Sequence, residues 1–347
     1  MKSPRSPIRS ALLPLAVAVL VAGTSAPSPP AAAASPPPAA ATATAPHEIE
    51  RVLAISIDGL NPDALRQLGR DGAPAIWRLI DQGVHTFDAR TAVEQTDTLP
   101  NHTSMVTGRV IAQERGGHGV TWNDTRTEPA TVQEAAGEDV GSVFTEVGSA
   151  GRSSALFTTK EKLGLFGRSW PDALDRVTVE GRDEALSAAA RRDLVAHHRA
   201  FTFVHLGGAD ASGHDHGFMS PEYVDTVGRL DGLVGRLLRA VRHRPQLEGT
   251  AVVLTADHGG RGESHRDRER RANYRVPFVV WGPQVGTGEL YGLQGGTYAD
   301  PGRAQVGYGA AAQPVRNGDV ANVSLDLLGL DAVPGSRIGR RQDLRLH

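Results

Sequence analysis

Short apolar runs alternate with longer amphipathic segments along the chain from residue 47 onward. Apolar, β-branched runs predict four strands, at Arg51–Ile57, Phe201–Leu206, Ala251–Thr255 and Val276–Trp281. Apolar residues at helical spacing predict a helix over Tyr223–Val241, and Pro62–Leu68 opens another. Strands that alternate with helices are typical of a mostly parallel sheet covered on both faces. We therefore expect one α/β domain over residues 47–347, with its ligand site beyond the carboxyl ends of the strands.

The first 46 residues have a different pattern. Three basic residues precede an apolar run over Ala11–Val21, and no acidic residue occurs before Glu48. This is typical of a secretory signal, which we place in residues 1–34 with cleavage between 26 and 34, and a Pro/Ala-rich disordered linker extends over 27–46. The apolar run is about half the roughly 20 residues of a membrane-spanning helix. The prediction is a secreted or extracytoplasmic protein without a permanent membrane anchor.

Composition narrows the possible chemistry. The chain has 347 residues and no cysteine, which excludes a disulfide, a thiolate metal site and a catalytic thiol. Its net charge of −2 at pH 7 becomes about −5 once the three bases of the signal are removed. No nucleic-acid-binding module is therefore expected. Nothing in the sequence specifies an oligomeric state.

Acidic residues and histidines follow three of the predicted strands. Asp58, Asp210 and the pair Asp257-His258 come directly or shortly after these strands, and His214 lies four residues beyond Asp210. Any one of these aspartates alone fits a helix cap or a turn. Three converging carboxylates, however, repel one another unless a cation lies between them. Oxygen and nitrogen ligands without sulfur favour zinc, manganese or iron.

Thr98 lies just before Pro100, a residue favoured in the first turn of a helix, and we expect that helix over Pro100–Thr107. An isolated threonine at this place typically caps the helix. The same place suits a nucleophile, because unpaired amides at a helix start attract a phosphate and a metal-bound hydroxyl can lose its proton and attack it.

Together these residues resemble the alkaline phosphatase superfamily, and within it the type I phosphodiesterase and nucleotide pyrophosphatase branch. The resemblance covers roughly residues 50–335 and rests on the following motifs: Asp58 at a strand end, Thr98-Leu99-Pro100-Asn101-His102, Met105-Val106-Thr107-Gly108, the Asp210 to His214 spacing, and Asp257-His258-Gly259. It implies a three-layer α/β/α sandwich with a mostly parallel central sheet. It also implies two divalent metal ions, with zinc as the expected metal, and a small-molecule phosphoester substrate.

The resemblance also assigns metal ligands. One ion would be held by Asp58, Thr98, Asp257 and His258, and the other by Asp210, His214 and a later histidine. After His258 the chain contains only His265 and the terminal His347, and chain ends fray, so we select His265. The alternative is that His265 is a solvated residue in an arginine-rich loop.

Three further residues match substrate-contacting positions of the superfamily. Asn123 matches an asparagine that contacts the phosphoryl oxygen. Lys160 and Lys162 resemble a lysine pair that phosphonoacetate hydrolases and some phosphomonoesterases direct at substrate, although a solvated helix face explains them equally well.

The predicted function is an exported phosphodiesterase or nucleotide pyrophosphatase-like hydrolase. Thr98 would attack phosphorus, and water would then release the phosphothreonine-type intermediate. The alternatives are a phosphomonoesterase or phosphonate hydrolase of the same superfamily, and a metal- or phosphate-binding protein on an inactive hydrolase scaffold. A sulfatase is disfavoured, because no Cys/Ser-x-Pro-x-Arg string occurs around Thr98.

Overall fold

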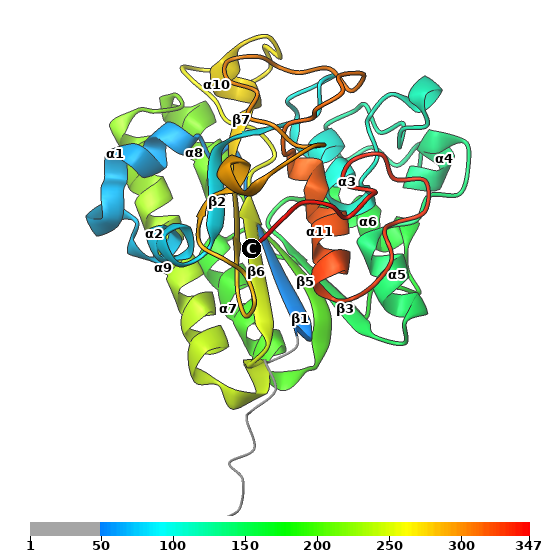
Figure 1. Ribbon diagram of the computed structural model, residues 1–347, viewed down its shortest axis with the longest axis horizontal. Coiled ribbons are helices and arrows are strands. Elements are labelled where there is room, and N and C mark those ends of the chain that lie inside the picture. Colours follow the sequence, from blue (N-terminus) through cyan, green and yellow to red (C-terminus); the bar gives the residue numbers. More distant parts are fainter. Residues whose placement is uncertain (1–48) are drawn as a thin grey trace, which may run out of the picture. The chain divides into compact units, whose positions relative to one another are not determined.

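The computed structural model describes residues 49–347, whose strands form one eight-stranded sheet (Figure 1). The predicted signal and the linker up to residue 46 lie outside the described residues. The strand order is β4-β3-β5-β1-β6-β7-β2-β8. The strands are β1 (Arg51–Ile57), β2 (Val84–Arg90), β3 (Ser153–Thr158), β4 (Arg176–Val179), β5 (Arg199–Leu206), β6 (Thr250–Thr255), β7 (Arg275–Trp281) and β8 (Gly288–Glu289). The four predicted strands are thus found as β1, β5, β6 and β7, with ends that differ by at most two residues.

The centre of the sheet is parallel. β1 pairs in parallel with β5 on one side and with β6 on the other, in registers that place Val52 beside both Phe201 and Ala251. β7 runs antiparallel to both β6 and β2, so the sheet is mixed but mostly parallel, as predicted. Every residue of β1 and β6 is buried, as expected for strands covered on both faces.

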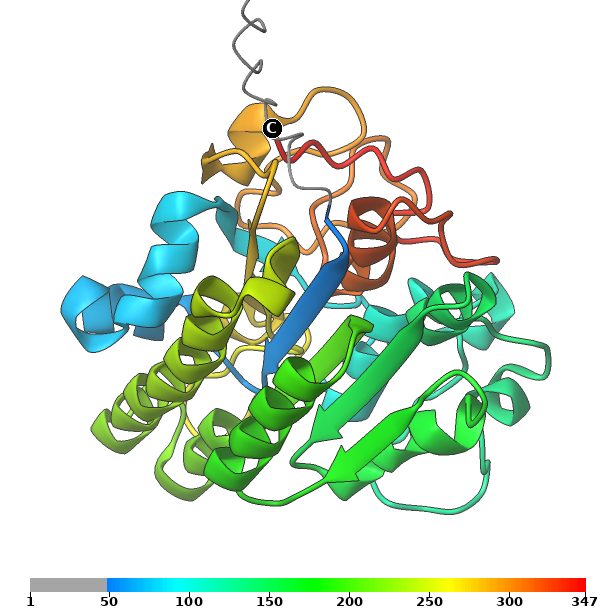
Figure 2. The same cartoon turned by 90° about the horizontal axis from the view of Figure 1, so that it is seen from below.

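Helices cover both faces of the sheet (Figures 1 and 2). One layer contains α2, α7 and α9, in which α2 packs against β7 and α7 packs against β3 and β5. The other layer contains α3, α5 and α11, in which α11 packs against β1 and β6. The helices are α1 (Pro62–Gly72), α2 (Pro74–Gln82), α3 (Thr98–Thr107), α4 (Val132–Ala136), α5 (Val143–Ser149), α6 (Leu165–Ser169), α7 (Asp183–Ala196), α8 (Gly208–His216), α9 (Pro221–His243), α10 (Arg271–Tyr274) and α11 (Val320–Leu327). Within residues 49–347, none of them is long and apolar enough to cross a membrane.

Helix α3 begins earlier than predicted. Its first residue is Thr98, and Asp97 occupies the cap position without a side-chain cap bond. The interpretation of Thr98 as a capping residue is therefore wrong. Thr98 is a buried residue of the first turn.

The carboxyl ends of β5, β1 and β6 lie side by side, because these strands are parallel neighbours. Asp58 follows β1, Asp257 follows β6, and Asp210 lies in the first turn of α8 after β5. Gly59 permits the close approach of these segments: its φ is +73°, and a Cβ there would lie 3.1 Å from Cα of Asp210. The topology alone therefore brings the three carboxylates together.

Candidate metal centre

The first of two ligand clusters contains Asp58, Asp257 and His258, all of them fully buried. Nε2 of His258 lies 3.4 Å from Oδ1 of Asp58 and 3.3 Å from Oδ2 of Asp257. Ligand atoms about 2.0–2.1 Å from a tetrahedral ion lie roughly 3.3 Å from one another. The spacing in this cluster therefore fits one cation.

The second cluster contains Asp210, His214 and His265. Asp210 and His214 share one face of α8, which places Nε2 of His214 3.4 Å from Oδ1 of Asp210. Nε2 of His265 lies 3.2 Å from Nε2 of His214 and 3.7 Å from Oδ1 of Asp210. His265 is buried, with 2% of its surface exposed, so the alternative of a solvated histidine does not describe it.

The two clusters are in direct contact. The rings of His258 and His265 are stacked, with centroids 3.6 Å apart and planes at 9°. Nε2 of His258 also lies 3.7 Å from Oδ1 of Asp210, a residue of the other cluster. The clusters are therefore adjacent, as two cations acting on one phosphoryl group require.

Several of the ligand atoms are buried without a hydrogen-bond partner. They are Oδ1 of Asp58, Oδ1 of Asp210, Oδ2 of Asp257 and Nε2 of His258. A buried polar atom without a partner is costly, and most such atoms in folded proteins are paired. Four such atoms that converge, together with Nε2 of His214 and His265, fit two divalent cations held by carboxylate oxygen and imidazole nitrogen.

Other polar atoms of these side chains, those that do not face the ligand cluster, form hydrogen bonds with neighbouring residues. Oδ1 of Asp257 accepts a hydrogen bond from the amide of Gly59 at 3.0 Å. Nδ1 of His258 lies 2.8 Å from the carbonyl oxygen of Gly259, and Nδ1 of His265 lies 2.7 Å from that of Thr96. In both histidines, a proton on Nδ1 that is donated to the carbonyl leaves Nε2 free as a ligand.

Charge and burial shift the pKa values in the centre. Burial and the charge of His258 lower the pKa of His265 to about 3, so its imidazole is neutral at pH 7. Burial and the charge of Asp58 raise the pKa of Asp257 above its usual range. Burial would lower the pKa of His258, but the carboxylates around it raise it. The three carboxylates therefore lie close enough to repel one another and to attract a positively charged group.

Thr98 lies at the start of α3, and residues on either side of it in the chain contact the two clusters. Thr96, two residues before it, donates its hydroxyl to the carbonyl of His265 at 2.6 Å. His102, one turn later, lies 3.7 Å from Oδ2 of Asp257 through Nδ1. Asn123 is beside the same turn, where its Oδ1 accepts from the amide of Leu99 at 2.9 Å. Asn123 thus contacts the first turn of the helix that Thr98 begins.

The two lysines lie in the site. Nζ of Lys160 is 2.7 Å from Oδ2 of Asp58 and 2.6 Å from Oδ2 of Asp210, so it joins residues of the two clusters. Nζ of Lys162 lies 2.9 Å from the carbonyl and 3.1 Å from Oδ1 of Asn123. Burial would lower the pKa of Lys160, but the charges of Asp58 and Asp210 raise it. The alternative of a solvated helix face is therefore wrong.

Two contacting histidines were not assigned a role from the sequence. His205 is buried in β5, with Nε2 3.0 Å from Oδ2 of Asp58. His102 places Nε2 2.8 Å from Oγ of Ser56 and Nδ1 2.9 Å from the carbonyl of Thr98. The signal available in the sequence was the polar ring inside FTFVHL, where a buried strand otherwise carries apolar side chains.

Comparison with known proteins adds a family match. The family model described as type I phosphodiesterase / nucleotide pyrophosphatase matches residues 52–278, which is more than half of the chain. Similar curated proteins include GPI ethanolamine phosphate transferase 1 of Schizosaccharomyces pombe, 26% identical over 254 residues, and that of Mus musculus, 24% identical over 253 residues. These alignments cover 68% and 69% of this chain, but only 27% of each relative. The chain therefore spans about a quarter of the length of these relatives.

Solved structures show the same fold. Murine ectonucleotide pyrophosphatase / phosphodiesterase 5, an inactive variant in complex with AMP, superposes with a TM-score of 0.60 at 15% identity, over 85% of this chain and 99% of that one. The lipoteichoic acid synthase LtaP from Listeria monocytogenes superposes with a TM-score of 0.58 at 13% identity, over 84% of this chain and 74% of that one. At these identities the likeness concerns the fold alone.

Proposed function

Because the chain belongs to the type I phosphodiesterase / nucleotide pyrophosphatase family of the alkaline phosphatase superfamily, we propose that it is a binuclear-metal phosphoester hydrolase. Its proposed substrate is a small-molecule phosphodiester or nucleotide pyrophosphate, its proposed metal is zinc, and its proposed location is outside the cytoplasm. The family and the two candidate metal sites support an enzyme that acts on phosphoester bonds. The choice of hydrolysis, of zinc and of export is part of the proposal.

One observation carries the proposal: unpartnered ligand atoms of both clusters converge at the carboxyl ends of neighbouring strands. If these side chains had only a structural role, their buried polar atoms would be expected to form hydrogen bonds. When bound, two cations would supply Lewis-acid polarisation of a phosphoryl oxygen and would stabilise charge on the attacking and leaving oxygens. The ligands proposed for one ion are Asp58, Thr98, Asp257 and His258, and for the other Asp210, His214 and His265.

The residues of the chain would then act in two displacements. The Thr98 hydroxyl attacks phosphorus, the bond from phosphorus to the leaving oxygen breaks, and a phosphothreonyl ester forms. Water attacks the same phosphorus and releases Thr98. In the monoester alternative, Lys162, which contacts Asn123, would also donate to a phosphoryl oxygen. Two successive inversions give net retention at phosphorus.

A transferase is a second candidate, because the curated relatives are named ethanolamine phosphate transferases. The first displacement would be the same, and an alcohol would replace water in the second. Glycerol added to the assay distinguishes the two functions. A transferase would convert a large share of the intermediate into a glycerol phosphoester, whereas a hydrolase would release the acid.

The proposal is tested by metal removal in a nitrophenol release assay. With bis(p-nitrophenyl) phosphate, the zinc-supplied protein is expected to turn over substrate, and dialysis against a chelator should lower the rate at least about 100-fold, roughly 2.7 kcal/mol of barrier. Adding zinc back should restore it. Tight zinc binding without turnover of a diester, a monoester, a phosphonate or a nucleotide would instead show a binding protein on an inactive scaffold.

Lys160→Ala and Lys162→Ala should separate the monoester and diester alternatives. A monoester carries more charge and more unshielded oxygens at phosphorus, so an ammonium directed at it stabilises it more than a diester. If the chain is a phosphodiesterase, both variants should change the diester rate by less than about threefold. The measurement is kcat/KM of each variant and of the wild type with p-nitrophenyl phosphate and with bis(p-nitrophenyl) phosphate. A collapse confined to the monoester, with wild type favouring it, would assign a phosphomonoesterase or phosphonate hydrolase.

A further inference from the structure

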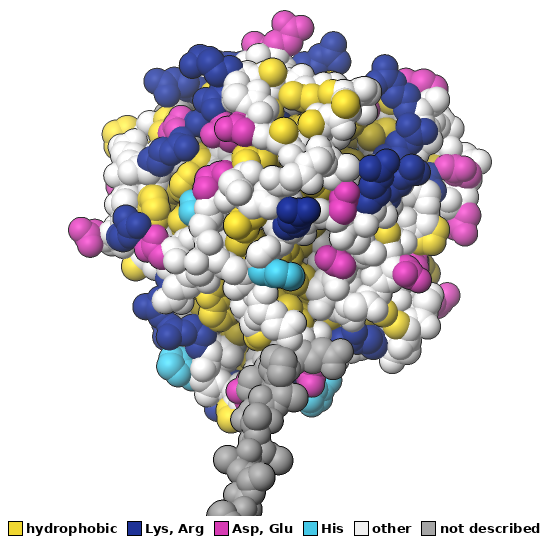
Figure 3. All heavy atoms as spheres, in the orientation of Figure 1, with side chains coloured by type: hydrophobic (Ala, Val, Ile, Leu, Met, Phe, Trp, Pro, Cys, Tyr) yellow, Lys and Arg dark blue, Asp and Glu magenta, His cyan; other side chains and the backbone are white. Residues whose placement is uncertain are grey.

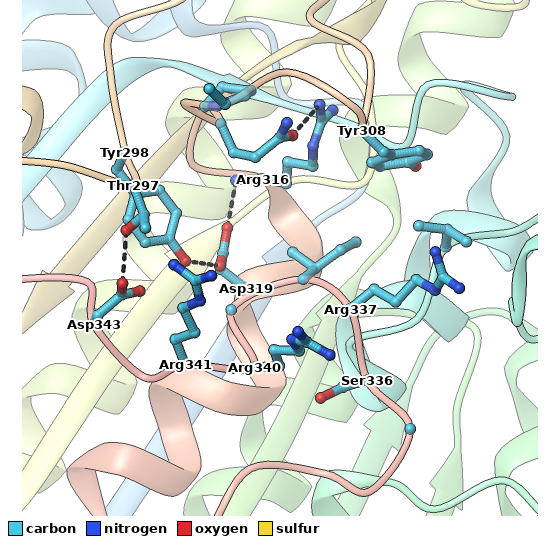
Figure 4. A pocket seen from close by; sticks show the side chains of 17 residues that line it. Thr297, Tyr298, Tyr308, Arg316, Asp319, Ser336, Arg337, Arg340, Arg341 and Asp343 are labelled. Atoms are coloured by element: carbon cyan, nitrogen blue, oxygen red, sulfur yellow. Dashed lines mark hydrogen bonds between the residues drawn. The ribbon is translucent and has the colours of Figure 1, made fainter.

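A cavity of about 590 Å³ lies between two segments near the C-terminal end of the chain (Figure 4). One wall comes from residues 297–314 and includes Tyr298 and Tyr308, and the other comes from residues 335–343. Val110, Arg316 and Asp319 complete the lining. Binding sites for small molecules typically have volumes of about 300–1,000 Å³. The cavity is therefore large enough to hold a small molecule and not only a single ion.

The cavity is separate from the metal centre. Thr98 begins α3, whereas the cavity lies beyond the other end of this helix, where the amides of Arg337 and Ile338 both donate to the carbonyl of Gly108 at 2.8 Å. Ten helical residues span about 15 Å at 1.5 Å per residue. None of the lining residues belongs to either ligand cluster.

Three arginines of one wall have free guanidinium groups. Arg337, Arg340 and Arg341 are exposed, and their side chains form no hydrogen bond or ion pair with any residue between 49 and 347. Figure 3 shows basic side chains gathered over this C-terminal part of the surface. A guanidinium stays protonated at every physiological pH and offers a fork of donors that matches an oxyanion.

The acidic groups of the lining are already engaged. Oδ1 of Asp319 accepts from the Tyr298 hydroxyl at 2.7 Å, and its Oδ2 accepts from the amide of Arg316 at 2.6 Å. Oδ2 of Asp343 accepts from the hydroxyl of Thr297 at 2.7 Å. Neither carboxylate pairs with the three free arginines, so the cavity keeps its positive charge.

A fourth guanidinium lies in the buried lining. Arg316 has 1% of its surface exposed, and its guanidinium lies 4.7 Å from the ring centroid of Tyr308. It donates to the carbonyl of Thr91, but its Nε is buried without a partner. Four guanidinium groups therefore line the cavity against two carboxylates, and even the buried one, Arg316, retains a donor without a partner.

We propose that this cavity is an accessory binding site for a phosphorylated small molecule. The phosphate would be held by Arg340 and its neighbour Arg341, because a dianionic phosphate can accept from more than one guanidinium at a time, and Arg337 adds positive charge to the same wall. The polar body attached to it would lie against the hydroxyl and amide groups of Thr297, Ser336 and Gln313 and the rings of the two tyrosines. The site depends on these residues and not on the metal centre.

Calorimetric titration of the full chain tests this site, with Thr98→Ala as the background so that no ligand is consumed. In chelator-treated protein, glucose 6-phosphate is expected to bind at one site per chain and more tightly than inorganic phosphate. The double change Arg340→Gln and Arg341→Gln should weaken this binding at least tenfold. In the metal-loaded protein, inorganic phosphate should occupy two sites, and the double variant should retain only one.

Arg345→Gln is the matched control, because Arg345 is exposed on the same segment but does not line the cavity. It should leave the affinity unchanged. Circular dichroism should show the same fold for the arginine variants as for their Thr98→Ala background, since the exchanged arginines are exposed. The proposal is overturned by a lack of saturable binding in the chelated protein, by equal weakening in the control, or by glucose 6-phosphate binding no tighter than phosphate. Because the chelator-treated protein lacks the metal that the proposed enzyme activity requires, these outcomes do not depend on that activity.

Discussion

Thr98→Ala is expected to lower kcat at least about a thousandfold, roughly 4 kcal/mol of barrier, while most of the metal affinity remains. The reason is that the substitution removes the attacking hydroxyl, whereas the three side chains of each cluster are untouched. Steady-state kinetics with bis(p-nitrophenyl) phosphate and elemental analysis of the same sample measure the two effects.

Thr98→Ser is the matched control for this substitution. Serine keeps a hydroxyl at the start of α3, so this variant should retain measurable turnover and a covalent phosphoryl adduct detectable by mass spectrometry. Thr98 is not the nucleophile if the alanine variant keeps more than about a tenth of the wild-type kcat, a loss below 1.4 kcal/mol.

His265→Ala should reduce the number of bound ions from two to one per chain and lower kcat at least about 100-fold. The substitution removes one of three ligand atoms from the cluster with Asp210 and His214. The cluster of Asp58, Asp257 and His258 keeps all of its side chains, so its ion should stay bound. Elemental analysis after exhaustive dialysis, together with titration of zinc into the chelated protein, gives both occupancies.

His216→Ala serves as the control for metal binding. His216 is exposed at the end of α8, the helix that carries His214, and it belongs to neither cluster. The His216→Ala variant should bind two ions per chain. A single ion in active wild-type protein, or full occupancy in His265→Ala, would refute the division of ligands between two sites.

The sequence predicted the central part of the fold because the central strands are apolar throughout. β1 and β6 are buried along their whole length, and the residues that follow them are fixed by topology at one edge of the sheet. β2, β3, β4 and β8 were not predicted. Three of the four residues of β4 are exposed, so an edge strand of this kind lacks the apolar run that marks a buried one.

The side chains that form the two clusters were predictable from the sequence, but the contacts that support them were not. Asp58 and Asp257 follow apolar strands, which is visible in the sequence. The position of Lys160 depends on the loop after β3, and its contact with Asp58 and Asp210 joins residues that are 102 and 50 positions away. Such contacts arise from tertiary packing, to which local patterns are insensitive.

The attachment of the ligands to three neighbouring strand ends has a consequence for how such proteins diversify. The carboxylates of Asp58, Asp210 and Asp257 are positioned by the sheet, whereas Asn123 belongs to the long connection between α3 and α4. That connection can lengthen, shorten or be exchanged between relatives without displacing a strand. A change in this one connection therefore alters the surface beside the two clusters and leaves the three carboxylates in place.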